Sequence, residues 1–549
     1  MRFDYIIIGA GSAGCVLANR LSEDKNNKVA VFEAGRSSDI WKVKMPLALL
    51  YTMHDPKYNW KYYSEPEPYL NNRKLFCPRA KMIGGCSAHN GMVFVRGNRD
   101  DYDRWASLGV KSWSYEKVLP YFKKIETWSG GENHYRGGNG LLPVNKSQNE
   151  NPLFKAFINS AGEAGYKINP DINGEEQEGF GMFDVTINNG ERASVSKHYL
   201  NPVKSRKNLS IFSNSFVEKI IFDGKKAIGI DVKIKNKIER IFANKEVILS
   251  GGSINSPQLL MVSGVGPAIH LKDNGIDVVH NLDGVGKNLQ DHLETYIQQE
   301  CKTTDTLYSC TKLFNKMRIG IEWFLFKKGP CSHSYLEAGG FAKSSNERKT
   351  SNIQFHFFPL FFDKNWIPQP TTYGYRLGVG PMRPSSRGHV KLRSLNIEDQ
   401  LYGLSFVAET CEDVCMKVTC SRKWSEVEDA LAESCIAENS TIGWGDYVDL
   451  YINVRVTNAN PRTLDTLLRI RFPVQITRGP DDLGNWNVVA SDAANAILTT
   501  GVPYDVAEGG NLQYMNASLS GINSNRFMSI SNRISDLAYS SAVLPPSGL

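Results

Sequence analysis

The fold of this chain is decided near its N-terminus by the stretch Asp4-Tyr5-Ile6-Ile7-Ile8-Gly9-Ala10-Gly11-Ser12-Ala13-Gly14. It opens with a largely apolar run typical of a buried strand, and the glycines that follow predict a tight turn. Residues 15–22 then predict a helix, and residues 29–33 predict a second strand. The order strand, glycine-rich turn, helix and strand predicts a dinucleotide-binding unit of an α/β fold.

Each glycine of this turn has its own predicted task. Gly9 makes the tight bend, Gly11 lets the backbone approach a pyrophosphate, and Gly14 lets the helix pack closely on the strand. The free NH groups and the dipole of the helix N-terminus favour an anion there. The residues expected to hold the pyrophosphate are Gly9, Gly11, Ser12, Ala13 and Gly14.

Glu33 stands at the end of the second strand, nineteen positions after Gly14. A carboxylate at this position accepts hydrogen bonds from the hydroxyls of a ribose, which argues against a 2′-phosphate. We therefore predict that Glu33, with Ala34 next to it, contacts the cofactor.

The composition is that of a globular protein. The 549 residues suggest two or three domains, and hydrophobic and charged residues make up 41% and 22% of the chain. No apolar run approaches the length of a membrane span, and a strand that begins at Phe3 leaves no room for a signal peptide. We therefore expect a cytoplasmic protein without a transmembrane segment.

Charge and cysteine content exclude two further classes of protein. The net charge of +7 comes without a basic stripe interleaved with aromatic residues, so no nucleic-acid partner is expected. The ten cysteines form no CxxC pair, which favours free thiols over a metal site.

Charge and histidines are distributed unevenly along the chain. Residues 1–394 carry 54 Lys and Arg against 38 Asp and Glu, whereas residues 395–549 carry ten against nineteen. The last of the ten histidines is His389. A change this abrupt marks a boundary of domain or of origin.

Two further segments have paired glycines at the start of an apolar stretch. The first is Ile83-Gly84-Gly85-Cys86-Ser87-Ala88-His89-Asn90-Gly91-Met92-Val93. Its glycines let backbone NH groups come close to a flat ring or a phosphate, although alone it also fits an ordinary tight turn. The second is Ile248-Leu249-Ser250-Gly251-Gly252-Ser253-Ile254-Asn255-Ser256-Pro257-Gln258-Leu259-Leu260, which predicts a buried strand, a turn and a helix with an early proline.

Together these blocks resemble the glucose-methanol-choline (GMC) family of FAD-dependent oxidoreductases, and within it the choline and related alcohol dehydrogenases. Two later segments resemble further family blocks in the right order, Gly284-Val285-Gly286-Lys287-Asn288-Leu289-Gln290-Asp291-His292 and Ser385-Ser386-Arg387-Gly388-His389-Val390-Lys391-Leu392. The resemblance covers residues 1 to about 394.

The resemblance implies an α/β fold, in which a Rossmann-like FAD-binding domain of the GMC type is joined to a substrate domain with an antiparallel sheet. The FAD-binding domain would be discontinuous, with residues 1–150 and 190–300, and the substrate domain would comprise residues 151–189 and 301–394. The antiparallel sheet would include residues 352–358 and 375–380. Residues 395–549 are an unrecognised, acidic and β-rich segment that replaces the family C-terminus.

The resemblance also implies FAD as the cofactor. Its flavin would take a hydride from the CH–OH group of a small primary alcohol, and the electron acceptor that reoxidises it is unknown. The backbone of Val217 would contact the adenine. The residues that would lie at the flavin are Gly84, Gly85, Asn90, Gly91, Met92 and Val93.

Two side chains have a special expected role. His89 occupies the place where choline-oxidising members carry a histidine bonded to the 8α-methyl carbon of the flavin; the alternative is a histidine that hydrogen-bonds near the ring or the phosphates. Glu337 lies in a stretch that is near the substrate in choline-type relatives, and would face a quaternary ammonium group. A surface or salt-bridged glutamate is the alternative for Glu337.

The catalytic residues are unknown. The family places its acid and base near the C-terminus, as a histidine in a His-Pro-x-Gly block and then a second His or Asn, and this chain has neither block after Ser394. His292, His333 and His356 are conceivable substitutes for the base.

The segment after residue 394 differs in kind. Apolar and polar residues alternate over residues 450–456 and 468–476, which predicts two antiparallel strands. Three explanations stay open: a hybrid or misassembled reading frame, a divergent native tail, or a non-catalytic flavoprotein with an added binding module. The predicted function is thus oxidation of a choline-like alcohol, or flavin binding by an inactive body with an interaction or structural module; a lyase without net redox chemistry is also conceivable.

Overall fold

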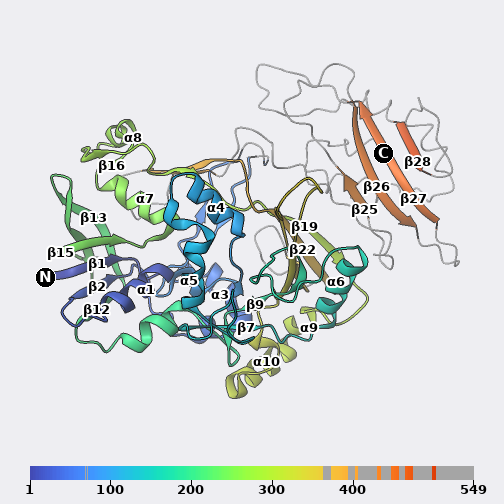
Figure 1. Cartoon of the computed structure of the whole chain (residues 1–549), viewed down its shortest axis with the longest axis horizontal. Coiled ribbons are helices and arrows are strands. Elements are labelled where there is room, and N and C mark those ends of the chain that lie inside the picture. The colour runs from blue at the N-terminus through green and yellow to red at the C-terminus, as the bar shows by residue number, and fades with distance from the viewer. Residues whose placement is uncertain are drawn as a thin grey trace. The chain divides into compact units, whose positions relative to one another are not determined.

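The computed structural model describes residues 1–67, 70, 72–362 and 372–393, together with the backbone of five strands beyond residue 401. Contacts divide the chain into two compact units. The first unit comprises Met1–Glu67 and Asn72–Ala408, and the second comprises Pro68–Asn71 and Glu409–Leu549. Figure 1 shows the elements of each unit.

A six-stranded sheet forms the centre of the first unit. Its strands, in spatial order, are β12 (Leu209–Phe212), β2 (Val29–Phe32), β1 (Arg2–Ile8), β15 (Lys237–Leu249), β14 (Lys226–Ile234) and β13 (Ser215–Asp223). The first four strands are parallel, and β15, β14 and β13 are antiparallel. Parallel strands lie on both sides of β1, and a helix connects β1 to β2. This is the arrangement of a Rossmann-like sheet.

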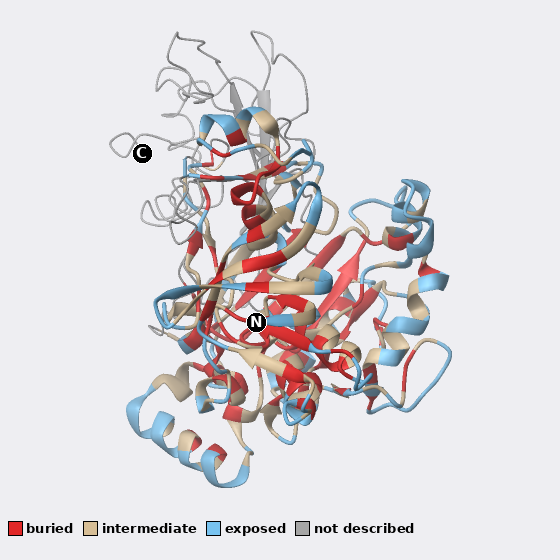
Figure 2. Ribbon diagram, turned by 90° about the vertical axis from the view of Figure 1, so that its left-hand side faces the viewer, coloured by how far each residue is buried: buried red, intermediate tan, exposed pale blue. Residues whose placement is uncertain are grey.

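The two faces of this sheet pack against different helices, because successive side chains of a strand point to opposite faces. Ile6 and Ile8 of β1 belong to the core cluster on one side, and Ile7 belongs to the cluster on the other. Figure 2 shows buried residues concentrated on the central strands and exposed residues on the outer surfaces of the helices.

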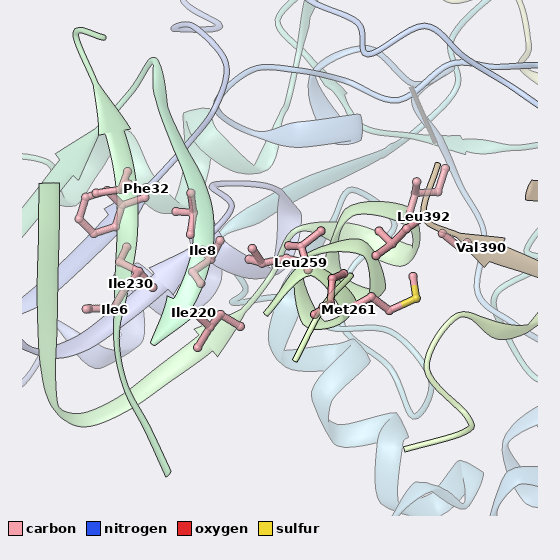
Figure 3. Packing of buried hydrophobic residues seen from close by; sticks show 14 of the residues in the cluster. Ile6, Ile8, Phe32, Ile220, Ile230, Leu259, Met261, Val390 and Leu392 are labelled. Carbon is pink, nitrogen blue, oxygen red and sulfur yellow. The ribbon is translucent and has the colours of Figure 1, made fainter. Parts of the chain in front are cut away.

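The first cluster is built against α7 (Gly252–Val262) and α8 (Ala268–Asp273), and Figure 3 shows part of it. It includes Val390 and Leu392, which belong to a segment far along the chain from β1. The second cluster is built against α1 (Ser12–Leu21).

The sequence predicts the opening unit closely. Helix α1 begins at Ser12, three residues before the expected start, because Gly11 itself is the extended N-cap residue and has no capping side chain to mark the boundary. The expected strand and helix around residues 248–260 are the end of β15 and α7. Pro257 lies in the interior of α7, because the helix already begins at Gly252.

A five-stranded antiparallel sheet forms the second large sheet of the first unit. In spatial order it contains β19 (Thr295–Glu300), β22 (Gly374–Pro381), β21 (Ile353–Phe358), β20 (Ala338–Ala342) and β8 (Gly179–Met182). Strands β21 and β22 confirm the two strands expected at residues 352–358 and 375–380, and they pair antiparallel.

Smaller sheets connect these parts. One has the order β5 (Val93–Phe94), β9 (Asp184–Val185), β7 (Leu142–Lys146) and β6 (Glu126–Trp128), and another has β18 (Lys287–Leu289), β23 (Gly388–Lys391) and β24 (Tyr402–Ser405). The described residues also form three two-stranded sheets: β3 (Tyr62–Tyr63) with β4 (Phe76–Cys77), β10 (Ile187–Asn188) with β11 (Glu191–Arg192), and β16 (Val265–Gly266) with β17 (His280–Asn281).

The other α-helices in the described residues of the first unit are, in chain order, α2 (Trp41–Lys44), α3 (Leu49–His54), α4 (Arg99–Ser107), α5 (Tyr115–Ile125), α6 (Pro152–Glu163), α9 (Tyr308–Thr311) and α10 (Leu313–Phe326). No helix in the described residues has both the length and the apolar character needed to cross a membrane.

The division of residues 1–394 into two domains stays a prediction. Strand β19, which ends the predicted segment 190–300, pairs with β22 of the antiparallel sheet. Val390 and Leu392, in the predicted segment 301–394, pack in the core of the six-stranded sheet. Long-range pairing of this kind leaves no mark in the local sequence pattern.

The described strands of the second unit form an antiparallel sheet in the order β25 (Ala430–Glu433), β26 (Tyr447–Val456), β27 (Leu464–Pro473) and β28 (Ile497–Gly501). Strands β26 and β27 confirm the pair expected from the alternation, with Leu450 opposite Ile470. Val474 and Ile476, which belong to the expected second strand, lie outside the described residues.

Candidate functional site

The first glycine turn has the shape that its predicted tasks require. A Cβ atom at Gly14 would lie 1.9 Å from the carbonyl oxygen of Gly9, so only glycine lets α1 pack so closely on the strand. A Cβ atom at Gly11, by contrast, would meet nothing closer than the Ser250 carbonyl oxygen at 3.7 Å. The protein itself therefore leaves open the space beside Gly11 that a bound phosphate group requires.

The N-terminus of α1 is electrostatically free for an anion. The helix begins at Ser12 with no side-chain cap and no acidic residue in its first turn. The free NH groups of that turn, which include those of Ser12 and Ala13, and the helix dipole both favour negative charge.

Glu33 fixes this turn to the end of β2. Its carboxylate accepts hydrogen bonds from the backbone NH groups of Ala10 at 2.9 Å and Gly35 at 2.8 Å. Burial raises the pKa of Glu33, and the two hydrogen bonds oppose that rise. Each carboxylate oxygen has a second lone pair, so a ribose hydroxyl can still donate to it. The half-buried Ala34 lies between Glu33 and Gly35.

The second glycine loop packs directly on the first. The NH group of Gly84 donates to the carbonyl oxygen of Ala10 at 2.7 Å. A Cβ atom at Gly85 would lie 2.7 Å from the Cα atom of Gly11. Ser250, directly after β15, donates its NH group to the carbonyl oxygen of Ile8 at 2.8 Å and thereby brings the third predicted loop to the same place. Three glycine-containing loops, far apart in sequence, therefore meet at one edge of the six-stranded sheet.

Val217 lies in β13, whose first residue is tied to the end of β2 by a hydrogen bond from the NH group of Ser215 to the Glu33 carbonyl oxygen at 2.8 Å. The pairing of β13 with β14 is irregular between Val217 and Lys219. The backbone at Val217 is thus near the strand that carries Glu33, and its contact with an adenine stays a prediction.

His89 is buried, with 3% of its surface exposed, and its Nδ1 atom has no hydrogen-bond partner among the described residues. Burial, together with the positive charges of Arg192 and Arg79, lowers the pKa of His89 to about 4. The imidazole is therefore neutral at neutral pH, which is the nucleophilic form. A buried polar atom of this kind is satisfied when a further group binds beside it.

Residues 90–93 form a fixed loop after His89. Met92 adopts a left-handed backbone conformation with φ of 60°, and its NH group donates to the Asn90 side-chain oxygen at 3.1 Å. Arg192 donates through Nη1 to both the backbone oxygen and the side-chain oxygen of Asn90, at 2.7 and 2.8 Å. Val93 then begins β5.

Arg192 is the site residue that sequence reasoning missed. It is 1% exposed, it also donates through Nε to the carbonyl oxygen of Val43, and burial lowers its pKa to about 9. Its Nη2 atom has no hydrogen-bond partner among the described residues. An arginine in a single sequence is expected at the surface, so no local signal could have marked it.

Glu337 lies in a segment that touches the Asn90–Val93 loop, because a Cβ atom at Gly91 would be 2.6 Å from Leu336 Cδ1. The carboxylate is fully buried and accepts hydrogen bonds from the Ser147 hydroxyl and from the Ser334 NH group at 2.8 Å. Its Oε2 atom is 3.4 Å from His333 Nδ1.

The carboxylate of Glu337 stays ionised although it is buried. Burial alone raises the pKa of Glu337, but the interactions with His333, Ser147 and Ser334 outweigh it and hold the pKa below its usual value. The site therefore contains a buried, ionised carboxylate beside the loop predicted to line the flavin, and contact of Glu337 with a substrate stays a prediction.

The three histidines considered as substitute bases differ in their surroundings. His333 is paired with Glu337, and His356 Nδ1 is 3.2 Å from Glu294 Oε1. His292 is exposed. Two of the three are thus imidazoles held by a carboxylate, the arrangement that supports proton transfer.

Comparison with known proteins gives this arrangement its context. A sequence profile described as GMC oxidoreductase matches residues 3–294. The chain is 46% identical over 396 residues to the oxygen-dependent choline dehydrogenase of Brucella ovis, a match that covers 72% of each protein. This chain belongs to the GMC oxidoreductase family. The match to these relatives ends near residue 394.

Other relatives of this GMC oxidoreductase agree. The oxygen-dependent choline dehydrogenase of Staphylococcus xylosus is 45% identical over 397 residues, covering 71% of each protein. The solved structure of pyridoxine 4-oxidase from Mesorbium loti is similar with a TM-score of 0.67 at 26% identity, covering 75% of this chain and 77% of that one. An FAD-dependent oxidoreductase from Chaetomium thermophilum has a TM-score of 0.64 at 26% identity, covering 73% and 77%.

The cofactor of this GMC oxidoreductase is FAD. The residues present fit it in three respects: the open space beside Gly11, the uncapped N-terminus of α1, and the buried Nδ1 atom of His89 that has no partner in the described residues.

Proposed function

We propose that this protein oxidises the CH–OH group of a small primary alcohol that carries a positively charged ammonium group, as choline does. The observation that carries the proposal is the buried, ionised Glu337 next to the Gly91 loop. A desolvated carboxylate near aromatic side chains suits a quaternary ammonium ion, which cannot donate hydrogen bonds and is recognised by charge and by ring faces. The names of the curated relatives support the same substrate class.

The aromatic component is present around this carboxylate. Tyr335 is buried, and its ring lies 6.3 Å from that of Phe154 and 6.1 Å from that of His333. Burial raises the pKa of Tyr335, so its hydroxyl stays neutral, and the nearby charge of Glu337 acts in the same direction. The negative charge available to a cationic substrate is therefore that of Glu337.

We propose that FAD is held by the residues named above. The NH groups of Ser12 and Ala13 bind the pyrophosphate beside Gly9, Gly11 and Gly14, and Glu33 accepts hydrogen bonds from the ribose. Bound FAD supplies the acceptor for the hydride, at flavin N5. The loop Asn90–Val93, with Gly84 and Gly85, fixes the orientation of the flavin, and the backbone of Val217 contacts the adenine.

We propose that His89 attaches the flavin covalently at its 8α-methyl carbon. An 8α C–H bond and the imidazole N–H bond would break as the C–N bond forms, both protons and two electrons would pass to the flavin ring, and the electron acceptor would reoxidise the reduced flavin. The neutral imidazole and the unpartnered Nδ1 atom support this assignment, because a ring nitrogen must be free and unprotonated to form the bond. Acid denaturation and filtration test it: the wild-type protein should stay yellow, and His89→Ala should release its FAD. Free FAD in the filtrate of the wild type would overturn the covalent bond and leave His89 a contact residue.

Removal of the hydroxyl proton requires a base, and this sequence lacks the one that the family uses. No histidine follows residue 389, so the base that the family places near its C-terminus is absent from this sequence. The imidazole–carboxylate pairs His333–Glu337 and His356–Glu294 are the candidate substitutes, and we expect neither pair to replace the missing base fully.

The experiment that tests the proposed function compares choline with 3,3-dimethylbutan-1-ol, its neutral isostere. Purified protein is mixed anaerobically with each alcohol, and bleaching of the flavin absorbance is followed. Bleaching at a much lower concentration of choline supports a cationic substrate. An equal response to both alcohols would contradict the role proposed for Glu337. If neither alcohol bleached the flavin, the proposed oxidation itself would be contradicted.

A second candidate function is flavin binding by an inactive body that carries an interaction or structural module. The observation that favours it is the separate, strand-rich unit after residue 408, which has no histidine. Yellow protein that no alcohol bleaches, and that turns over no dye acceptor, would support this function.

A further inference from the structure

Helix α10 carries two apolar faces, and the first unit buries one of them. Ile319 and Trp323 are 3% and 1% exposed, and they pack with Met45, Ala48 and Cys331. The indole NH group of Trp323 donates to the Gly190 carbonyl oxygen at 2.7 Å. This face anchors the helix to the body of the protein.

The other apolar face lies in solvent. The side chains on it are between 52% and 85% exposed and are Leu313, Phe314, Met317, Ile321, Phe324 and Leu325. Because each residue of an α-helix turns by about 100°, these six positions fall within an arc of about 120°, well apart from Ile319 and Trp323. Isolated exposed apolar residues are ordinary, whereas a contiguous face of large ones marks a binding surface. Figure 1 shows α10 at the lower edge of the first unit.

Aromatic side chains from two other helices extend this face. Trp41 of α2 and Tyr51 of α3 are 41% and 43% exposed. The ring of Trp41 lies 5.7 Å from that of Phe324 and 6.1 Å from that of Tyr51. The exposed face of α10 and these two rings together are called the α10 surface below.

Basic residues border the α10 surface. The segment 312–328 contains the single acid Glu322 and five basic residues, which are Lys312, Lys316, Arg318, Lys327 and Lys328. On the helical wheel Arg318 falls on one side of the exposed apolar arc and Lys316 on the other. Lys316 also lies over the ring of Tyr51, 5.3 Å from its centroid, and so borders the aromatic part.

This charge pattern indicates which partner binds the α10 surface. A second copy of the chain, docked by a two-fold axis, would bring the basic border of one copy against that of the other, and like charges repel. A helix with large apolar residues on one face, aromatic rings beside it and lysine and arginine at its borders is the pattern of an element that lies in the interface of a bilayer rich in anionic lipids.

We infer that the α10 surface docks this protein onto the surface of an anionic membrane. Phe314, Met317 and Leu325 enter the boundary between headgroups and acyl chains, and Arg318 and Lys328 contact the lipid phosphates. The inference is independent of the alcohol that the protein oxidises. It requires a peripheral attachment alone, since the apolar face is one side of a 14-residue helix.

The test uses the purified full chain and vesicles of phosphatidylcholine, with and without phosphatidylglycerol, in a flotation assay. We expect the protein to float with vesicles that contain phosphatidylglycerol, and to be released by raised salt. Phe314→Ser combined with Leu325→Ser should weaken binding by roughly tenfold or more, because two exposed apolar side chains no longer enter the bilayer. Arg318→Gln should weaken binding to the anionic vesicles by roughly fivefold and leave binding to pure phosphatidylcholine unchanged.

Leu108→Ser combined with Ile269→Ser is the matched control, because both side chains are at least as exposed as Leu325 and lie on other helices or loops. Flavin content and melting temperature of every variant are measured in parallel. Failure to float with any vesicle would overturn the inference, as would binding that the control pair and the α10 pair reduce equally. Dimerisation in the absence of lipid that the α10 pair abolishes would also overturn it, since the surface would then bind a second copy.

Discussion

The two units of this chain present opposite situations. In residues 1–393, three glycine-containing loops from distant parts of the sequence meet at one sheet edge, and buried charged groups such as Glu33, Arg192 and Glu337 have specific partners. The unit after residue 408 contributes an antiparallel sheet, a surplus of acidic residues and no histidine. From this difference we propose that binding of FAD and removal of the hydroxyl proton depend on different parts of the chain. The residues proposed to hold FAD lie within the matched region, whereas the family places its base beyond that region.

The largest expected effect concerns FAD binding by the first unit. Replacing Gly11 with Leu should abolish flavin retention, because the side chain fills the space that the pyrophosphate requires. The fold should survive, since a Cβ atom at Gly11 meets no atom closer than 3.7 Å. The ratio of absorbance at the flavin band to that of the protein measures the loss, and circular dichroism confirms the fold.

Gly284→Leu is the control for this change, because a Cβ atom there meets nothing within 4 Å and the glycine lies outside the turn. It should retain its flavin. A yellow Gly11→Leu protein would show that the pyrophosphate lies elsewhere.

The next effect concerns the missing base and tests the second half of the comparison. Turnover of choline with a dye acceptor should fall roughly 10²- to 10⁴-fold below the usual enzymatic range of about 1 to 1000 per second, because that is the contribution of a well-placed general base. Steady-state assays on protein of known flavin content measure it.

Ordinary turnover would contradict this expectation and would show that a base lies within the first unit. His333→Ala and His356→Ala would then name it, because only the loss of the true base removes the turnover. His292→Ala tests the third candidate in the same way, and the exposed His134→Ala serves as the control.

A smaller effect sharpens the assignment of the substrate to the first unit. Glu337→Gln should weaken choline binding by roughly ten- to hundredfold, because it removes the buried negative charge while an oxygen remains to accept the Ser334 hydrogen bond. Binding of 3,3-dimethylbutan-1-ol should change little. Perturbation of the flavin spectrum gives both dissociation constants, and the exposed Glu347→Gln is the matched control. Equal weakening of both alcohols would mean that Glu337 acts through the shape of the loop and not through its charge.

The parts of this fold that the sequence predicts are those with a local physical signal. The β1 turn and Gly14 are predicted because a helix can approach a strand this closely at glycine alone, and the tail strands because alternation reflects two faces of a sheet. The parts of the structure that the sequence does not predict depend on long-range contacts. Arg192 is buried because carbonyl groups from residues 43 and 90 surround it. Helix α10 has two apolar faces, and which of them is buried is set by its packing on Met45, Ala48 and Cys331 rather than by its own pattern.

The smallest effect concerns acid stability, and it should be confined to the first unit because all ten histidines precede residue 390. His198 lies in the short helical segment Ser196–Leu200, its Nε2 atom has no hydrogen-bond partner among the described residues, and burial with the nearby Lys197 lowers its pKa to about 4. Above pH 6.5 the imidazole is neutral in both the folded and the unfolded chain, so the full stability is present. As the pH falls from 6.5 toward 4, the unfolded chain takes up a proton that the folded chain refuses, and the free energy of unfolding decreases. At pH 5 the decrease in the free energy of unfolding is about 1–2 kcal/mol, a value that allows for the partial exposure of the ring.

His198→Gln should therefore lose less stability between pH 7 and pH 5 than the wild type does. The difference should be a few degrees or less in the melting temperature of the first unit. The exposed His134→Gln should follow the wild type. An identical pH dependence in all three proteins would show that His198 gains a partner on protonation that offsets the cost of its burial.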